Sequence, residues 1–264
     1  MHKNKITELS RKKRRRFFLR IFIFIFMISS LSYGIYYFFN HPKFQIKNIE
    51  IEDLKYTEKA VILKIFELNT SGKHVNLFSK NNILFFSESI ISNNIKDILS
   101  VENVSIRREF PDILRVEIVE HEPWGIWCEN INTKCYLVNK NGLAFVSAPE
   151  IILEDLIKIS DDKNKDILGN NFVSEDVFSK FVRIEKLLRK INVSISQITT
   201  KDYQTFILQT KDGPKLFIDS KNDPVEVVNN LKTTIEQESI HEIQFKNIEY
   251  VDLRFRGKAY YKIK

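Results

Sequence analysis

Four histidines that follow residue 40 could act as general bases or metal ligands: His41, His74, His121 and His241. They are widely scattered and show none of the short spacings of metal-ligand motifs. His121-Glu122 could form an acid–base pair, but neighbouring residues of a strand point to opposite faces. We therefore interpret this pair as the solvated end of a strand.

Motifs for nucleophiles and phosphate sites are incomplete in this sequence. Ser160-Asp161-Asp162-Lys163 matches S-x-x-K, the nucleophile motif of penicillin-binding enzymes, but the S-D-N and K-T-G partner motifs do not occur. The seven glycines form neither G-x-G-x-x-G nor a P-loop, and G-x-S-x-G is also missing. The sequence therefore predicts no enzyme activity, no cofactor and no metal site.

Two cysteines, Cys128 and Cys135, flank a polar segment between two apolar ones, which suggests opposite strands of one hairpin. A disulfide between them is allowed in an oxidising compartment, and two free thiols are an equal alternative. No nearby His or Cys completes the four ligands of a zinc site.

The elements that must carry these residues begin with an uncharged segment, Ile21–Phe39. As a helix it would reach about 28 Å, close to the hydrocarbon thickness of a bilayer. The basic cluster at 11–16 favours a cytoplasmic N-terminus, which places the 225 residues after Phe39 outside the cytoplasm. A cleaved signal peptide ending near Ser30-Leu31-Ser32 is the alternative, but the apolar run is too long for one.

The net charge of +7 belongs to the N-terminal tail. Residues 1–20 hold nine Lys or Arg and one Glu, whereas the rest of the chain holds 32 basic and 33 acidic residues. Binding to a phosphate backbone needs a basic surface on the folded part. We therefore expect no nucleic-acid partner, and contact between the tail and membrane lipid.

The apolar pattern predicts an α+β fold with two domains behind a single N-terminal transmembrane helix. The expected divisions are a cytoplasmic tail over 1–20, a transmembrane helix over 21–39, a POTRA domain (β-α-α-β-β) over 43–122, and a mixed, mostly antiparallel β-domain with flanking helices over 123–264. The POTRA elements are a strand over 44–51, helices over 57–68, with Thr57 as N-cap, and over 82–99, and strands over 101–108 and 113–120.

The β-domain elements are strands over 124–128, 135–139, 143–146, 151–159, 193–199, 203–210, 215–218, 248–255 and 258–263, and helices over 174–191 and 224–238. Asn141-Gly142 is typical of a tight turn, and Asp223-Pro224 with Glu226 is typical of a helix start.

Four segments in order resemble the FtsQ/DivIB family of bacterial cell-division proteins. They are VSIRREFPDIL at 104–114, IVEHEPWGIW at 118–127, YLVN at 136–139 before Gly142, and YVDLRFRGKAY at 250–260. The layout of basic tail, single span, POTRA domain and β-domain is also similar. The sequence departs from the family pattern at four places. Ile118 stands where the family usually has Val, and Gly125 stands where it often has Ala. Ile218-Asp219 stands where the family commonly has a Gly, and the cysteine pair is not a family feature.

The resemblance implies a non-enzymatic scaffold of the divisome in the bacterial inner membrane, at the division septum. Its POTRA domain would meet other divisome components, and its β-domain would bind the coiled-coil proteins FtsB and FtsL and so help control septal peptidoglycan synthesis. Two alternatives remain open: a POTRA-containing export or outer-membrane assembly component, and a membrane-tethered envelope hydrolase.

The resemblance also places FtsB on a terminal edge strand, Lys258–Ile263. Arg254 would pair with a partner carboxylate, Phe255 would fill an apolar contact, Gly257 would permit the turn, and Ala259, Tyr260 and Tyr261 would line the added strand. The residues alone support another interpretation, in which Lys258, Lys262 and Lys264 protect the edge from pairing. Core packing is likewise an alternative role for Phe255 and Tyr260.

Overall fold

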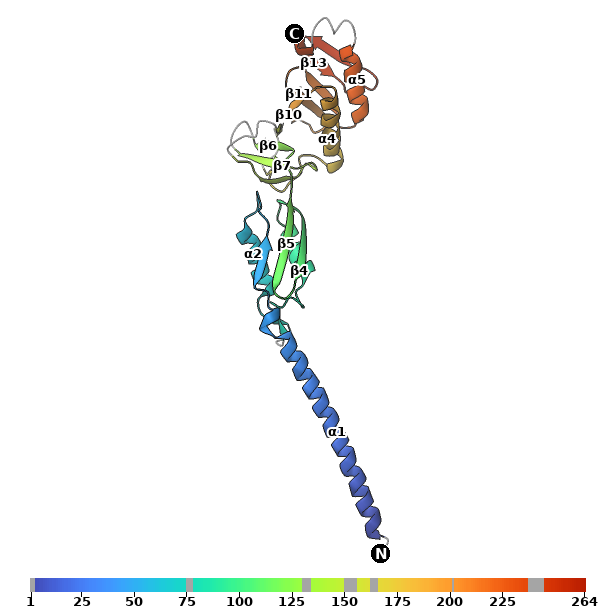
Figure 1. The fold of residues 1–264 in the computed structure, drawn as a ribbon. Coiled ribbons are helices and arrows are strands. Elements are labelled where there is room, and N and C mark those ends of the chain that lie inside the picture. Colours follow the sequence, from blue (N-terminus) through green and yellow to red (C-terminus); the bar gives the residue numbers. More distant parts are fainter. Residues whose placement is uncertain are drawn as a thin grey trace. The chain divides into compact units, whose positions relative to one another are not determined.

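The computed structural model describes residues 3–74, 78–129, 134–149, 156–161, 166–200, 202–236 and 245–264. The chain divides into two compact units, with the division between Val119 and Glu120. Figure 1 shows the helices and strands of both units.

The first unit begins with one long helix, α1 (Lys3–Phe39), drawn in blue in Figure 1. Its section Arg14–Phe39, 26 residues long, is long and apolar enough to cross a membrane. None of the most apolar stretch of this section is buried inside the protein. The segment expected to span the membrane, Ile21–Phe39, is thus wholly helical.

A three-stranded sheet with two helices follows α1. The elements are η1 (Pro42–Phe44), β1 (Asn48–Ile51), α2 (Lys59–Thr70), β2 (Lys73–His74), β3 (Phe78–Ser79), α3 (Glu88–Lys96), β4 (Val101–Glu109) and β5 (Ile113–Glu120). The strand order is β1-β5-β4, and β1 runs parallel to β5. The predicted POTRA order of strand, helix, helix, strand, strand is confirmed, with the short β2–β3 hairpin between the helices.

The core of this unit lies between the sheet and one face of each helix. Both helices place apolar side chains four residues apart, the spacing that gives a helix one apolar face. The buried helix residues are Ile62 and Phe66 on α2 and Ile91 and Ile95 on α3. They pack with the buried strand residues Val104, Ile106, Leu114 and Val116.

The second helix is shorter than the sequence predicts, because it begins only at Glu88: Asn82 bridges to Gln45, and residues 83–85 form a turn. The side chain of Asn82 accepts a hydrogen bond from the backbone N–H of Leu84 at 2.8 Å, a local contact that competes with helix formation. Ile83 and Phe86 are nevertheless buried, as expected for apolar residues of this segment.

Two further expectations for this unit are wrong. Thr57 is not the N-cap of α2, because the helix starts after Glu58 and the Thr57 hydroxyl lies 2.6 Å from the Ser100 hydroxyl. Phe44 does not open the first strand, because Pro42 begins a 3-10 turn that includes it. β1 therefore begins at Asn48.

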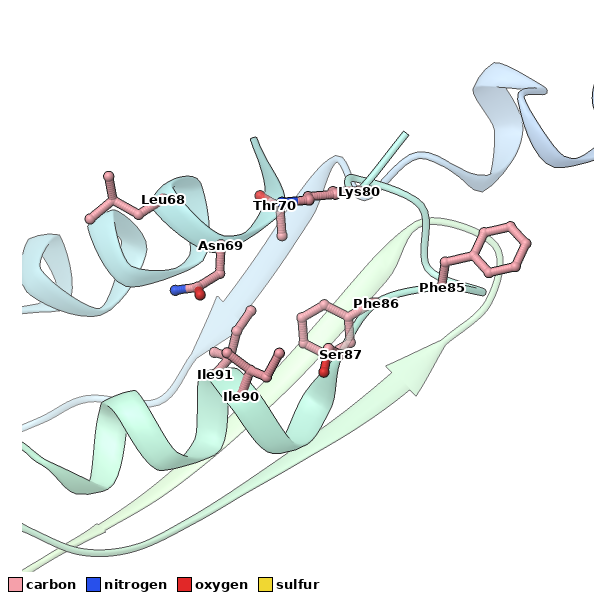
Figure 2. Close-up of a pocket in the computed structure, with 9 residues that line it drawn as sticks. All are labelled: Leu68, Asn69, Thr70, Lys80, Phe85, Phe86, Ser87, Ile90 and Ile91. Carbon is pink, nitrogen blue, oxygen red and sulfur yellow. The ribbon is translucent and has the colours of Figure 1, made fainter. Parts of the chain in front are cut away.

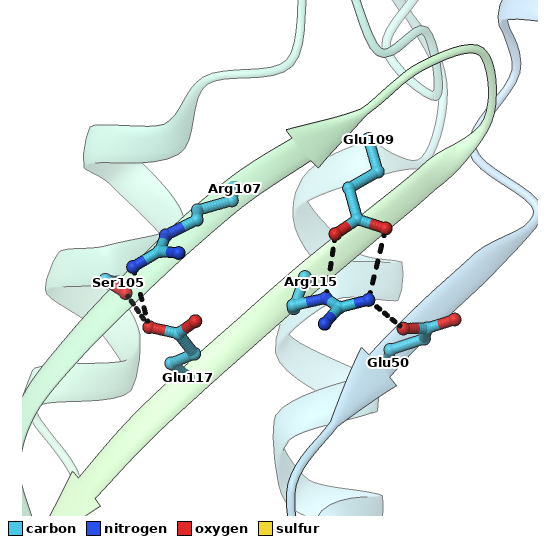
Figure 3. Close-up of polar contacts among 6 residues, drawn as sticks. All are labelled: Glu50, Ser105, Arg107, Glu109, Arg115 and Glu117. Carbon is cyan, nitrogen blue, oxygen red and sulfur yellow. Dashed lines mark hydrogen bonds and ion pairs between the residues drawn. The ribbon is translucent and has the colours of Figure 1, made fainter.

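The sheet face opposite the helices is charged (Figure 3). Arg115 on β5 lies between Glu109 on β4 and Glu50 on β1, with nitrogen–oxygen distances of 2.8 and 3.1 Å. Arg107 and Glu117 form a second pair across β4 and β5, at 3.2 Å. These pairs are exposed, so each contributes at most about 1 kcal/mol to stability.

The second unit is a single mixed sheet with two helices. Its elements are β6 (Gly125–Glu129), β7 (Lys134–Val138), β8 (Ala144–Ser147), β9 (Ile157–Asp161), α4 (Glu175–Lys190), β10 (Ile195–Thr200), β11 (Thr205–Thr210), β12 (Lys215–Asp219), α5 (Pro224–Glu236), η2 (Phe245–Asn247), β13 (Ile248–Asp252) and β14 (Tyr260–Ile263). The strand order is β14-β13-β12-β11-β10-β9-β6-β7-β8.

Most neighbouring strands of this sheet are antiparallel, and three pairs are parallel: β6 with β9, β9 with β10, and β12 with β13. α4 joins the parallel strands β9 and β10, and α5 lies in the connection between β12 and β13. The predicted mixed, mostly antiparallel domain with flanking helices is confirmed.

Both helices of this unit lie side by side and pack on the sheet (Figure 1). Phe181 and Leu188 on α4 and Leu231 on α5 are buried against Phe206 and Leu216 of the sheet. α5 starts as the sequence predicts, because Asp223 Oδ1 accepts hydrogen bonds from the backbone N–H groups of residues 225 and 226.

Several strand ends differ from the prediction. β9 covers 157–161 instead of 151–159, and residues 150–155 lie outside the described part of the chain. The predicted end of the last helix, at residue 238, also lies outside it. β13 stops at Asp252 and β14 starts at Tyr260, so the connection between them is longer than predicted.

Candidate partner-binding edge

β14 is the last strand of the nine-stranded sheet, and among the described strands it pairs only with β13. The pairing is antiparallel and sets Tyr261 opposite Val251 and Tyr260 opposite Asp252. Every residue of β14 is exposed. An edge of this kind leaves backbone N–H and C=O groups free to pair with another extended chain.

The connection between β13 and β14 is tied to the helix α5. The backbone N–H of Gly257 donates to Glu226 Oε1 at 3.0 Å, and Lys258 N–H donates to the Phe255 carbonyl at 3.2 Å. Gly257 has a φ of +64°, in the left-handed region that favours glycine. The turn role that the sequence suggested for Gly257 agrees with this conformation.

Arg254 binds a carboxylate of its own chain, Asp252. The guanidinium donates two hydrogen bonds, Nε to Oδ1 at 2.9 Å and Nη2 to Oδ2 at 2.6 Å. Burial alone raises the pKa of Asp252, but the hydrogen bonds and the charge of Arg254 outweigh burial, so this pKa lies below the ordinary aspartate value. The hydrogen bond to Asp252 also raises the pKa of Arg254.

Asp252 is a further member of this site that the sequence did not predict. The spacing Asp252-x-Arg254 was a usable signal, because residues two apart in an extended segment point to the same side. Phe217 and Tyr250 also belong to this surface without having been predicted, and their rings meet edge to face at 5.5 Å on neighbouring strands. The Arg254 guanidinium lies 5.8 Å from the centre of the Phe217 ring, within cation–π range.

Phe255 and Tyr260 are surface residues and not core residues. Their side chains are 50% and 53% exposed, and their rings meet edge to face at 5.4 Å. Arg254 also lies 5.9 Å from the centre of the Phe255 ring. An exposed aromatic pair beside an open strand edge is a typical feature of a docking surface.

The predicted strand-lining residues do not share one face. Tyr260 lies on the same face as Asp252, whereas Tyr261 lies opposite Val251 on the face that carries the helices. Ala259 is partly buried against the core. The structure therefore places Phe255 and Tyr260 together, and Tyr261 on the other side of β14.

Two lysines of the edge make contacts within the chain. Lys262 Nζ lies 2.7 Å from Glu249 Oε2, and Lys264 Nζ donates to the Lys246 carbonyl at 2.7 Å. Lys258 is exposed. Because Glu249 neutralises Lys262, the positive charge of Lys262 opposes pairing with a partner strand less than that of an unpaired lysine.

The side chains of His121 and Glu122, considered as an acid–base pair, have separate partners. The His121 ring lies 3.2 Å from the Asn139 amide and 5.5 Å from the centre of the Phe145 ring, while Glu122 binds Lys140 at 3.2 Å. Across the described ranges, no three His, Cys, Asp or Glu side chains gather as metal ligands do. His241, Asp162 and Lys163 lie outside those ranges.

Cys128 and Cys135 lie directly opposite each other on β6 and β7 and are joined by a disulfide. The disulfide links two paired strands, and residues 130–133 between those strands lie outside the described part of the chain. It is in the second unit at the side of the sheet away from β14, because β6 and β14 are six strands apart in the order.

A pocket in the first unit lies between the end of α2 and the start of α3 (Figure 2). Its volume of about 150 Å³ is below the 300–1,000 Å³ of ordinary small-molecule sites. Phe86 turns into this pocket, and Phe85 turns outward at one end of it. The pocket is therefore too small to hold a whole substrate or cofactor.

Comparison with known proteins gives the family. Residues 44–121 match the model of the POTRA domain, FtsQ-type. The chain is 24% identical over 157 residues to the cell division protein FtsQ of Aliivibrio fischeri, which covers 59% of this chain and 54% of that protein. It is 23% identical over 184 residues to the cell division protein DivIB of Clostridium tetani, with 70% and 63% covered.

A third relative extends the match over most of the chain. The cell division protein FtsQ of Rickettsia bellii is 23% identical over 234 residues, which is 88% of this chain and 77% of that protein. The match to the Aliivibrio protein spans only about half of that relative's length. These names describe cell division and no enzyme activity. The FtsQ-type POTRA domain, together with similarity to proteins named FtsQ and DivIB that continues into the mixed β-sheet, supports the assignment of the chain to the FtsQ/DivIB family of bacterial cell-division proteins.

Proposed function

We propose that this chain is a non-enzymatic, single-pass membrane scaffold of the divisome, and that β14 binds FtsB. The helix α1 would hold the chain in the cell membrane, with the basic tail in the cytoplasm and both folded units outside it, at the division septum. The POTRA domain would contact other divisome components. Through FtsB and FtsL the chain would help control septal peptidoglycan synthesis.

The observation that supports this proposal most is the exposed edge of β14. A partner strand added there would gain backbone hydrogen bonds along Tyr260–Ile263, a mode of recognition that other sheets use. The exposed rings of Phe255 and Tyr260 would supply apolar contact on one face of that strand, and Tyr261 on the other. Since Asp252 already neutralises Arg254, we assign Arg254 to shaping this surface.

The test is co-purification of FtsB of the same organism with variants of the full chain. Phe255→Lys and Tyr260→Lys each place a charge on the apolar contact, and deletion of 258–264 removes the strand. All three should lose most of the bound FtsB. Leu168→Lys is the matched control, because Leu168 is 45% exposed and adjoins β8 at the opposite edge of the sheet.

Full binding by folded Phe255→Lys and Tyr260→Lys variants would contradict the assignment of the site. Fluorescent localisation tests the wider proposal, since a divisome scaffold gathers at midcell and an export component spreads around the envelope. Protease added to spheroplasts tests the orientation, because it should digest both units and leave the basic tail protected.

A further inference from the structure

We propose that the α1-proximal end of the POTRA domain is a lipid-binding surface, on which the groove beside Leu68, Phe85 and Ile90 contacts the headgroup region of the membrane that α1 crosses. This inference rests on the proposed membrane span of α1. It assigns a lipid surface as a ligand of the POTRA domain, whereas the proposed FtsB site is the β14 edge of the second unit.

The helix α1 continues into the POTRA domain through direct contacts. The buried side chain of Asn82 donates from Nδ2 to the carbonyl of Phe39, the last residue of α1, at 2.5 Å. Five residues after Phe39, the carbonyl of Phe44 accepts a hydrogen bond from the backbone N–H of Ile83 at 2.9 Å. The end of the helix is therefore fixed to the loop that carries Phe85.

Aromatic rings surround this junction. The Phe39 ring lies 4.8 Å from the Phe85 ring and 6.0 Å from the Phe78 ring, and Tyr36 lies 6.4 Å from Phe78. If Ile21–Phe39 crosses the hydrocarbon, Phe39 lies at its outer boundary. The polar layer beyond that boundary is about 5–7 Å thick, so the Phe85 ring, 4.8 Å from the Phe39 ring, lies at the boundary or in the polar layer next to it. Aromatic side chains favour this layer.

The groove extends this aromatic region along the domain (Figure 2). Phe85 lines one end of it, and Leu68 on α2 and Ile90 on α3 lie on its walls. Leu68 and Ile90 are 68% and 53% exposed, although both are large aliphatic side chains. Asn69, Thr70, Lys80 and Ser87 add polar groups to the lining. Because Phe85 takes part in both the groove and the junction, the groove is continuous with the aromatic region next to α1.

That continuity favours lipid over a protein or a soluble ligand as the occupant. The groove is too small for a drug-sized molecule, and its Phe85 end lies where lipid headgroups are the surrounding medium. Nearby charges are mixed: Lys43, Lys73 and Lys80 are opposed by Glu67 and Glu88. Contact should therefore depend mainly on apolar burial and only weakly on anionic lipid.

The test uses the full chain in lipid nanodiscs, in a Cys128→Ser, Cys135→Ser background, with the environment-sensitive fluorophore NBD on one introduced cysteine. The positions are Leu68→Cys, its control Val61→Cys, and Ser30→Cys in the middle of the expected span. Val61 is 43% exposed and lies two turns from Leu68 on the same side of α2, about 10 Å away. The quencher is a lipid with a doxyl group near the headgroup.

The proposal expects NBD at residue 68 to be quenched at least about twofold more strongly than NBD at residue 61. A second lipid, with its doxyl group deep in the acyl chain, reports on residue 30. If NBD is quenched equally weakly at residues 68 and 61, while the deep doxyl lipid quenches NBD at residue 30 strongly, this inference is overturned and the proposed span remains intact. Absence of quenching at residue 30 overturns the span and this inference together.

Discussion

The guanidinium of Arg254 binds the carboxylate of Asp252 through two parallel hydrogen bonds at the end of β13. The backbone N–H of Arg254 donates to the same carboxylate, at 3.1 Å. The pair closes the strand with a local turn and holds Arg254 beside Phe217 and Phe255. A partner at β14 would therefore meet a neutral, shaped surface rather than a free positive charge.

The role of Arg254 can be separated from that of a partner-binding cation by comparing two substitutions. Arg254→Ala and Asp252→Asn should both weaken FtsB co-purification, because each removes the pair that shapes the turn. If Arg254 instead binds a carboxylate of FtsB, Asp252→Asn frees it, and binding should be retained or increase. Isothermal titration with purified FtsB distinguishes the two outcomes.

The pair should also make stability depend on pH. The folded-state pKa of Asp252 lies below its ordinary value of 3.8, so the ionised form contributes stability that is complete above that value and is lost as the pH falls through the lower folded-state pKa. We expect Asp252→Asn to lower the free energy of unfolding of the second unit by about 1–3 kcal/mol at pH 7.

The measurement is denaturant unfolding in detergent, followed by the fluorescence of the buried Trp127. The difference in unfolding free energy between the wild type and Asp252→Asn should become progressively smaller below pH 4 than it is at pH 7. An equal difference in unfolding free energy at pH 7 and well below pH 4 would contradict the role of the ionised pair.

Gly125 occupies a position where the family often has Ala, and this chain should not tolerate that residue. A Cβ atom at Gly125 would lie 2.8 Å from the carbonyl oxygen of Ile157 on the neighbouring strand β9, which is backbone and cannot turn away. Gly125→Ala should destabilise the second unit by about 1–3 kcal/mol. Hydrogen exchange should accelerate in β6 and β9.

Gly257→Ala is a useful comparison, because a Cβ there meets nothing within 4 Å and only the positive φ is unfavourable. Its cost should be about 1–2 kcal/mol, and its effect on hydrogen exchange should be confined to β14 and its turn. Similar exchange patterns in the two variants would contradict the steric explanation for Gly125.

The disulfide between Cys128 and Cys135 should stabilise the second unit moderately. The bond closes a short loop, with a sequence separation of seven, and loops of this length lose about 2–3 kcal/mol of unfolded-state entropy. Reduction, or the double substitution Cys128→Ser, Cys135→Ser, should lower the unfolding free energy by that amount. Alkylation of the unreduced, denatured protein should label neither cysteine; labelling of both would show free thiols.

Local sequence patterns determined much of the fold. The uncharged run Ile21–Phe39, the alternating strands β4 and β5, and the Asp223 cap of α5 all depend on contacts between near neighbours, so their signals lie in short segments. The family resemblance at 104–127 and 250–260 likewise came from short, local segments.

Other features were decided by side chains that are distant in sequence. The side chain of Asn82 donates a hydrogen bond to the carbonyl of Phe39, 43 residues away, a contact that the apolar pattern does not predict. Thr57 meets Ser100 across the domain and does not cap α2. In the candidate site, the sequence named Arg254, Phe255 and Tyr260 but not their arrangement.

Hydrophobic period and short motifs are local properties, so the sequence alone predicts the long apolar N-terminal helix, the two α+β units and the resemblance to the FtsQ/DivIB family. Only the tertiary structure decided that Arg254 is bound by Asp252, that Phe255 and Tyr260 form one exposed pair, and that Tyr261 faces the other way. These facts depend on strand register and strand order, which long-range packing sets.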